Sequence, residues 1–252
     1  VGIAEKGYAT FRLSLSGEGG HSSMPPPHGT IARLAEAVVE LEDEQMPSRL
    51  HGPTRQMIDT LAPHMGFGAR LVLGNLWLFN GVVASGLSMD PVAGASVRTT
   101  TAPTIFNAGS AENVLPQNAT ATVNFRILPG DTVESVKAHI IDVIDDDAIE
   151  VECIGDCRDP SATSPVDVEG FTAVEDAIRR TFEGVIVAPY LVVGGTDARH
   201  YQGVSEQIYR FLPLRLRKEQ RVMIHGTDEH VESEALADAV RFYAGLMLDV
   251  AG

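Results

Sequence analysis

The 252 residues suffice for one large domain or two ordinary ones, and 44% hydrophobic with 21% charged residues is typical of a soluble globular protein. The formal net charge of −15, from 34 acidic and 19 basic side chains, disfavours nucleic acid and anionic membrane surfaces, because both repel a negative protein. We therefore expect no nucleic-acid partner and no membrane partner.

The first 157 residues alternate between the periodicities of strands and of helices. Apolar side chains at every second position predict half-buried strands, and apolar side chains three or four residues apart predict amphipathic helices. These patterns predict strands over residues 9–15, 99–105, 119–127 and 148–154, and helices over residues 30–46 and 132–146. Asp131 is the expected N-cap of the second helix, with Glu134 at its N3 position. The order β-α-β-β-α-β predicts a ferredoxin-like domain, in which four antiparallel strands carry two helices on one face.

Residues 47–98 do not fit this order, and we expect them to be an insertion between the first helix and the second strand. Within them, residues 71–89 contain no charged side chain, and this length could just span a bilayer. The asparagines, serines and three glycines of this window disfavour a membrane span, because polar groups are costly in lipid and glycine weakens a helix. We therefore expect a buried or interfacial segment of a soluble protein.

A second unit, residues 158–252, begins with a turn-rich linker. Its patterns predict a helix over residues 170–182, an apolar strand over residues 184–193 and a terminal amphipathic helix over residues 234–248. This unit has too few strands for a whole α/β domain. The predicted fold class is thus α/β (α+β), with a ferredoxin-like domain at residues 1–157 and part of an α/β domain at residues 158–252.

Cys153 and Cys157 are the only cysteines. Two sulfurs four residues apart make neither a disulfide framework nor a four-thiolate zinc site. We expect a pair of reduced thiols near the end of a strand.

Two further stretches contain candidate site residues. His225 precedes Asp228 and Glu229 at a helix entrance, which suits a zinc ligand, but the chain has no H-E-x-x-H motif and the spacing alone leaves metal binding open. Residues 194–197, Gly-Gly-Thr-Asp, form a strand-to-helix corner. Such a corner either presents backbone N–H groups to an anion or is a plain tight turn.

Four ordered stretches together resemble a known family: residues 5–27 (EKGYATFRLSLSGEGGHSSMPPP), 113–132, 192–201 and 211–231. They are similar to the co-catalytic zinc aminoacylase/carboxypeptidase family, which includes glutamate carboxypeptidase, succinyl-diaminopimelate desuccinylase and peptidase T. The long insertion and the stretch RFLPLRL point to its carboxypeptidase S-like and N-fatty-acyl-amino-acid hydrolase branch. The resemblance implies a zinc-bearing α/β domain with an inserted ferredoxin-like lid, and a homodimer formed through that lid.

The resemblance also implies roles for individual residues. His21 resembles the lid histidine that reaches the active site of the partner subunit and polarises the scissile carbonyl. Substrate-binding residues are implied at Asn113, Arg126, Gly195, Thr196, Asp197 and Arg199. His225 resembles the last metal-binding histidine of a site that holds two zinc ions.

The family's H-x-D motif and its adjacent glutamate pair are absent from this sequence. The chain therefore resembles a C-terminal fragment, which we expect to be inactive alone and unable to hold two zinc ions. The implied function of the intact enzyme is cleavage of amide bonds next to a free carboxylate, as in N-acyl amino acids or peptide C-termini. The alternative is a non-enzymatic ferredoxin-like dimerisation module that binds a small carboxylate. We expect a cytoplasmic protein.

Overall fold

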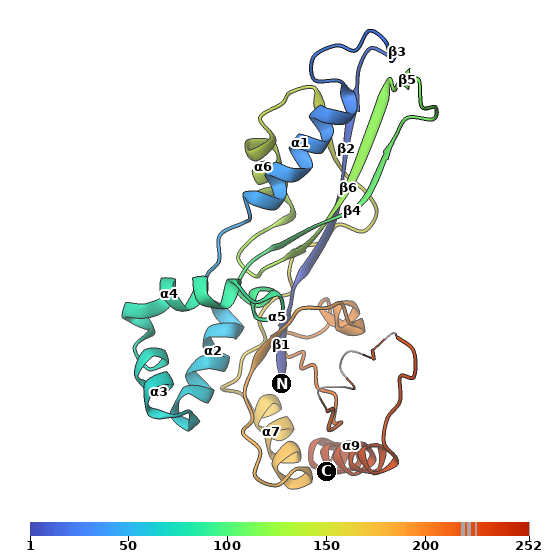
Figure 1. Ribbon diagram of the computed structural model, residues 1–252. Coiled ribbons are helices and arrows are strands. Elements are labelled where there is room, and N and C mark those ends of the chain that lie inside the picture. Colours follow the sequence, from blue (N-terminus) through green and yellow to red (C-terminus); the bar gives the residue numbers. More distant parts are fainter. Residues whose placement is uncertain (218–219, 221–222, 225, 252) are drawn as a thin grey trace.

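Four strands form one antiparallel sheet in the structure, a computed structural model that describes residues 1–217, 220, 223–224 and 226–251 (Figure 1). Their order is β4-β6-β2-β7, and each neighbouring pair is antiparallel. This is the strand order of a ferredoxin-like β-α-β-β-α-β unit, so the predicted fold is confirmed. The strands are β2 (Gly7–Ser16), β4 (Thr100–Ala108), β6 (Asn118–Ile127) and β7 (Ile149–Cys153).

Two helices cover one face of this sheet (Figure 1). Alternate residues of β2 and β6 point toward the helices, and the buried rings of Phe11 and Phe125 meet edge to face with centroids 5.8 Å apart. Leu34 and Ile140 complete this core from the two helices. The helices are α1 (Thr30–Asp43) and α6 (Val133–Ile144).

The cap of α6 lies one residue later than predicted. The Thr132 hydroxyl accepts the Ser135 N–H, and the Ser135 hydroxyl accepts the Thr132 N–H, which together form a capping box. Asp131 instead forms an ion pair with Arg49 (2.9 Å) and accepts a hydrogen bond from the Thr99 hydroxyl (2.5 Å). The predicted cap at Asp131 is wrong because these tertiary partners hold its carboxylate.

Residues between α1 and β4 form five short helical segments. They pack around a small core of their own, formed by Leu50, Ile58, Leu76, Ala84 and Val97. Among the described residues, no single helix is long and apolar enough to cross a membrane, although α3 and α4 together meet that test as a pair bent by 106°. The segments are α2 (Gly52–Leu61), η1 (Ala62–His64), α3 (Phe67–Leu73), α4 (Leu76–Ser88) and α5 (Pro91–Gly94).

The second half of the chain packs around the first strand of the molecule. β1 pairs in parallel with β8, and Ile3 shares a core with Ile178 and Phe242. The predicted strand over residues 184–193 is wrong for its first part, because Gly184 adopts a positive φ of 72° and Pro189 donates no hydrogen bond. The elements are β1 (Gly2–Glu5), α7 (Glu169–Thr181), β8 (Tyr190–Val192), η2 (Asp197–Tyr201) and α9 (Ser233–Ala251).

Residues 2–5 thus pair with the second unit, and the domain boundary at residues 157/158 stays a prediction. Cys153 and Cys157 form a disulfide, with Cα atoms 6.6 Å apart. Gly155, at a φ of 74°, allows the turn that brings the two cysteines together after β7. The prediction of reduced thiols is therefore wrong.

Candidate functional site

His21 lies on a short ribbon at the tip of the sheet. β3 (Gly20–His21) pairs with β5 (Val114–Leu115) beyond the ends of β2 and β6, and His21 is opposite Val114 (Figure 1). Asn113 precedes β5, and its carbonyl accepts the Ser22 N–H (3.1 Å). The structure thus brings the exposed side chains of His21 and Asn113 to the same tip.

The loop determines which nitrogen of His21 carries a proton. The backbone N–H of Ser23 donates to Nδ1 at 3.1 Å, so Nδ1 is an acceptor. In a neutral imidazole the proton then lies on Nε2. Nε2 is therefore a hydrogen-bond donor, as polarising a carbonyl oxygen requires.

Close packing of two backbones holds this loop. A Cβ atom on Gly19 would lie 2.6 Å from Cγ of Gln117 and 3.1 Å from the carbonyl oxygen of Leu115. Only glycine permits so close an approach. The segment that carries His21 is thus fixed against the strand that follows Asn113.

Arg126 lies at the other end of the sheet, beside an aromatic ring and a second arginine. It is half-buried on β6, opposite Tyr8 on β2. Its guanidinium carbon lies 4.8 Å from the centroid of the Tyr8 ring, and that of Arg158 lies 5.3 Å from the same centroid. Tyr8 therefore holds two arginines in one place through cation–π contacts.

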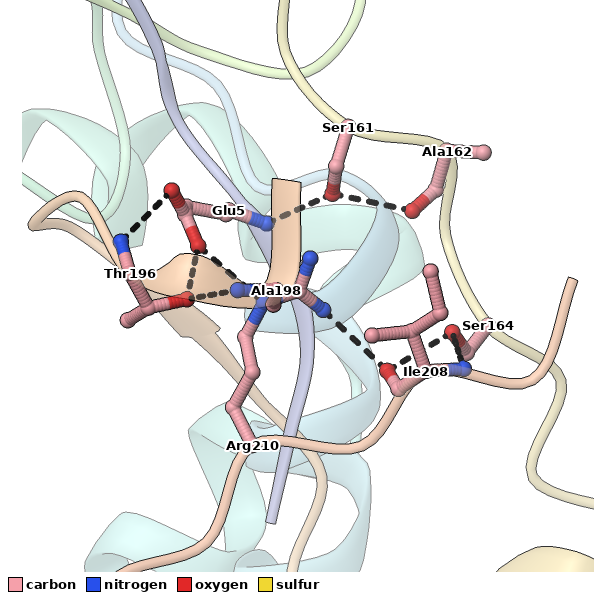
Figure 2. A network of polar contacts seen from close by, with 8 residues as sticks. All are labelled: Glu5, Ser161, Ala162, Ser164, Thr196, Ala198, Ile208 and Arg210. Carbon is pink, nitrogen blue, oxygen red and sulfur yellow. Dashed lines mark hydrogen bonds and ion pairs between the residues drawn. The ribbon is translucent and has the colours of Figure 1, made fainter. Parts of the chain in front are cut away.

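A buried carboxylate fixes the corner at residues 194–197 (Figure 2). Oε1 of Glu5 accepts the Thr196 N–H (2.9 Å), and Oε2 accepts both the Thr196 hydroxyl (2.5 Å) and Nε of Arg210 (3.2 Å). The Glu5 N–H donates to the Ser161 hydroxyl. Both polar groups of Thr196 are thus committed to Glu5, which leaves the corner's free surface to its exposed neighbours Gly195 and Asp197.

A cavity of about 410 Å³ lies where β1 passes into β2. Lys6, Arg158 and Arg199 contribute three basic groups to its lining. Arg158 pairs with Asp156 at the rim, and Nε of Arg199 donates to Nε2 of His200 (3.2 Å). Glu5, Asp156 and Asp159 line it as well, so the cavity holds charges of both signs. Its two arginines are the groups suited to bind a carboxylate.

Lys6 is buried at the centre of this region. Its Nζ donates to the carbonyl oxygens of Ala95 (2.9 Å) and Arg98 (2.8 Å). Burial, and after it the nearby charge of Arg126, lowers the pKa of Lys6 to about 7, although Asp131 acts in the opposite direction. The lysine therefore ties the strand junction to the end of the helical insertion.

The predicted site residues thus fall into two groups. Gly195, Thr196, Asp197 and Arg199 lie at or beside the junction cavity, and Arg126 lies close by over Tyr8. His21 and Asn113 lie beyond the other end of β2, whose ten residues span roughly 30 Å at about 3.3 Å per residue. One chain does not bring the two groups together.

Five further residues of the junction were not predicted as site residues: Glu5, Lys6, Tyr8, Arg158 and Arg210. The stretch EKGY was recognised only as part of a motif. Burial of its charges depends on partners 90 to 200 residues away, which no local pattern reveals.

The predicted metal ligand, His225, stays a prediction. The described part of the chain contains no group of three or more His, Cys, Asp or Glu side chains that could hold a metal ion. His225, the predicted ligand, lies outside the described residues. The His, Cys, Asp and Glu side chains of the described residues do not form a ligand set, so we derive no chemical step through a metal.

Comparison with known proteins gives matches over nearly the whole chain. Residues 3–152 match the family described as a peptidase dimerisation domain. The chain is 41% identical over 249 residues to the N-fatty-acyl-amino acid synthase/hydrolase PM20D1 of Xenopus tropicalis, covering 98% of this chain and 48% of the relative. It is 38% identical over 247 residues to the probable carboxypeptidase S-like 2 of Dictyostelium discoideum, covering 98% and 47%.

A solved structure agrees with the fold. The M20 family metallo-carboxypeptidase of Sulfolobus solfataricus superposes with a TM-score of 0.59 at 14% identity, covering 97% of this chain and 58% of that one. At this identity the likeness concerns the fold alone. The chain spans about half the length of the curated relatives it matches.

Proposed function

The chain belongs to the M20 peptidase family through its dimerisation domain, and from that premise we propose that it is the C-terminal part of a metal-dependent amidohydrolase. The bond cleaved lies next to a free carboxylate, as in an N-acyl amino acid or a peptide C-terminus. The observation that carries this proposal is the separation of a histidine donor at the tip from a group of arginines at the strand junction.

The junction is proposed to bind the substrate carboxylate. Arg126 presents a planar guanidinium held over Tyr8, and such a fork binds a carboxylate through two hydrogen bonds. Arg199 and the corner at Gly195 border the neighbouring cavity, and Arg158 of that cavity shares the Tyr8 ring with Arg126. The free carboxylate is thus the group that orients the substrate.

His21 is proposed to act on the substrate of the partner subunit. Its own junction lies roughly 30 Å away, which is beyond the reach of any side chain. In a homodimer, the tip of one subunit can lie beside the junction of the other, so the distance within one chain is no obstacle. The Nε2 proton then meets the scissile carbonyl oxygen as negative charge develops on it.

Two zinc ions are the proposed cofactor of the intact enzyme, and His225 is the one ligand proposed from this chain. The cytoplasmic location and the absence of a nucleic-acid partner stay predictions.

Mixing two impaired variants of the full-length enzyme, assayed at a substrate concentration far below KM, tests the proposal. His21→Ala lacks the tip donor and Arg126→Ala lacks the junction fork. If His21 acts across the dimer, a mixed dimer holds one intact site and one doubly defective site. Random exchange of subunits then restores about a quarter of wild-type activity. The assay is hydrolysis of an N-acyl amino acid after the variants are dissociated and reassociated together.

A mixture of His21→Ala with His21→Gln is the matched control, because neither subunit supplies a tip histidine. No recovery in the first mixture, with dimers intact, would show that His21 does not act in trans. Carboxylate binding without hydrolysis by the full-length protein would favour the non-enzymatic dimerisation module.

A further inference from the structure

α4 carries no charged side chain on any side, and its polar side chains are Asn80, Ser85 and Ser88. Leu76 and Ala84 are buried against Ile58 of α2, as expected of a core helix. The opposite side is not covered, and Trp77 and Val82 are 79% and 72% exposed. A helix with so few polar side chains is normally buried in a protein core or in lipid, and this one is only half buried.

Further exposed apolar side chains lie on α3 and directly after α4. We call the whole exposed set the α3–α4 face, and it consists of Phe67, Leu71, Trp77, Leu78, Val82 and Met89. Residues 71–89 carry no charge, and Arg70 and Asp90 are the charged residues that flank them. Figure 1 shows the two helices at the outer edge of the molecule, away from the sheet and from α7 and α9. Contiguous exposed apolar surfaces of this kind mark sites of interaction.

α9 shows that exposure alone does not define such a face. Leu236 and Val240 on α9 are also exposed, but Asp238 and Arg241 interrupt their surroundings. From Trp77 to Met89 the α3–α4 face has no such interruption, and its one charged side chain is Arg70, between Phe67 and Leu71 on α3. The α4 part offers a partner no charge and no ion pair, which suits the hydrocarbon boundary of a lipid layer better than a protein surface, and the long side chain of Arg70 can extend to the headgroups.

We propose that the α3–α4 face binds peripherally to a lipid surface with neutral, zwitterionic headgroups. α3 and α4 have 7 and 13 residues and are bent by 106°, so neither reaches the about 20 residues of a span, and both can lie in the plane of the interface. Trp77 is the residue type that prefers this depth. The net charge of −15 opposes anionic lipids, which commits the proposal to neutral ones.

The identity of the lipid surface as partner rests in part on the proposed function. N-acyl amino acids with long acyl chains are amphiphiles that partition into lipid layers. An enzyme that rests on the layer would meet them where they accumulate. The proposal departs from the expectation of no membrane partner, because the net charge argues against anionic surfaces and not against neutral ones.

Trp77 gives a direct test, because it is the only tryptophan in the chain. On titration with phosphatidylcholine vesicles, we expect its emission to shift to the blue and to be quenched by brominated acyl chains. Replacing a quarter of the lipid with phosphatidylserine should weaken binding. The double variant Leu78→Glu with Val82→Glu should lower the partition coefficient at least about tenfold, because each charge must leave water.

The matched control places the same two charges on α9, as Leu236→Glu with Val240→Glu, and should bind as the wild type does. Circular dichroism of all three proteins shows whether they are folded, and Phe67→Ser with Leu71→Ser provides a second, uncharged variant that spares α4. No blue shift with neutral vesicles, or equal loss in the α9 control, would overturn the proposal. A blue shift that follows protein concentration without lipid would also overturn it, by assigning the face to contacts between copies. None of these measurements uses hydrolysis, so failure here is distinct from failure of the proposed function.

Discussion

Lys6 is buried with its amine on two carbonyl oxygens, and this determines how stability depends on pH. Its pKa, near 10.5 when unfolded, is lowered to about 7 in the fold by burial and by Arg126. The unfolded chain therefore binds the proton more tightly, and the free energy of unfolding rises as pH increases from 7 toward 10. A neutral amine keeps two N–H donors, so both carbonyl bonds survive deprotonation.

We predict that Lys6→Met removes this pH dependence. Urea denaturation at pH 7 and pH 9 should show the wild type gaining stability, by a margin on the order of 2 kcal/mol, while the variant changes less. The Val1 amino group, whose pKa burial lowers to about 6, is common to both proteins and cancels in the comparison. Equal pH slopes for the two proteins would mean that Lys6 is not buried in the way described.

The ion pair of Glu5 and Arg210 is the second buried charge system, and each side chain is almost completely covered. Glu5→Gln would leave the guanidinium buried without its counter-ion, which costs about 3–5 kcal/mol in such pairs. The midpoint of urea denaturation measures this loss. Glu36→Gln, at an exposed glutamate of α1, should change stability by less than about 0.5 kcal/mol. Similar losses in both variants would argue against a special role for the pair.

Kinetics should separate the tip from the junction in the full-length enzyme. His21→Ala removes a donor that acts on developing charge, so kcat should fall about a hundredfold while KM and metal content stay unchanged. Arg126→Ala removes a group that holds the substrate carboxylate throughout, so KM should rise. If His21→Ala lowers stability and leaves the activity of folded enzyme unchanged, the histidine is structural.

Strands and helices with a periodic apolar face were predictable from the sequence, and features that depend on contacts between distant residues were not. The strands around Phe11 and Phe125 and the helices around Leu34 and Ile140 were predicted within a few residues, because one buried face imposes its period on the sequence. The cap of α6 was misplaced because Asp131 has partners at Arg49 and Thr99, which sequence spacing does not show.

The candidate site was predictable to the same extent. The tip histidine follows from its motif, but the junction around Lys6, Tyr8 and Arg158 needs the fold. Residue 158 comes to Tyr8 only because the chain turns back after β7, through Gly155 and the disulfide of Cys153 with Cys157. The segment after β7 has no periodic pattern of apolar residues, so its sequence does not indicate that it lines a cavity.

The α6 cap gives a prediction at the scale of one helix. Thr132→Ala should cost about 1 kcal/mol and should speed hydrogen exchange in the first turn of α6, because the Ser135 N–H loses its acceptor, the Thr132 hydroxyl. Asp131→Ala should instead speed exchange around Thr99, where its carboxylate accepts a hydrogen bond. The reverse pattern would restore the capping role first assigned to Asp131.

On the scale of the whole molecule, the long sheet separates the two halves of the proposed site and leaves two free edges. The edge at β7 carries Glu150 and Glu152, whose like charges oppose self-pairing. The edge at β4 carries Ile105 and Phe106, both exposed. Apolar side chains beside unpaired backbone groups favour β4 as the edge that meets a second copy.

We therefore predict a homodimer that pairs through β4. Sedimentation equilibrium should show a dimer for the wild type, and Ile105→Lys with Phe106→Lys should raise the dissociation constant at least about tenfold, because two positive charges would face their copies across the two-fold axis. Glu150→Lys with Glu152→Lys makes a larger charge change at the opposite edge and should leave the dimer intact. Dissociation by the β7 variant, with the β4 variant still dimeric, would move the interface to the other edge. The tip that carries His21 would then approach the partner subunit from the other side of the sheet. The proposal that it reaches the junction of that subunit would have to change.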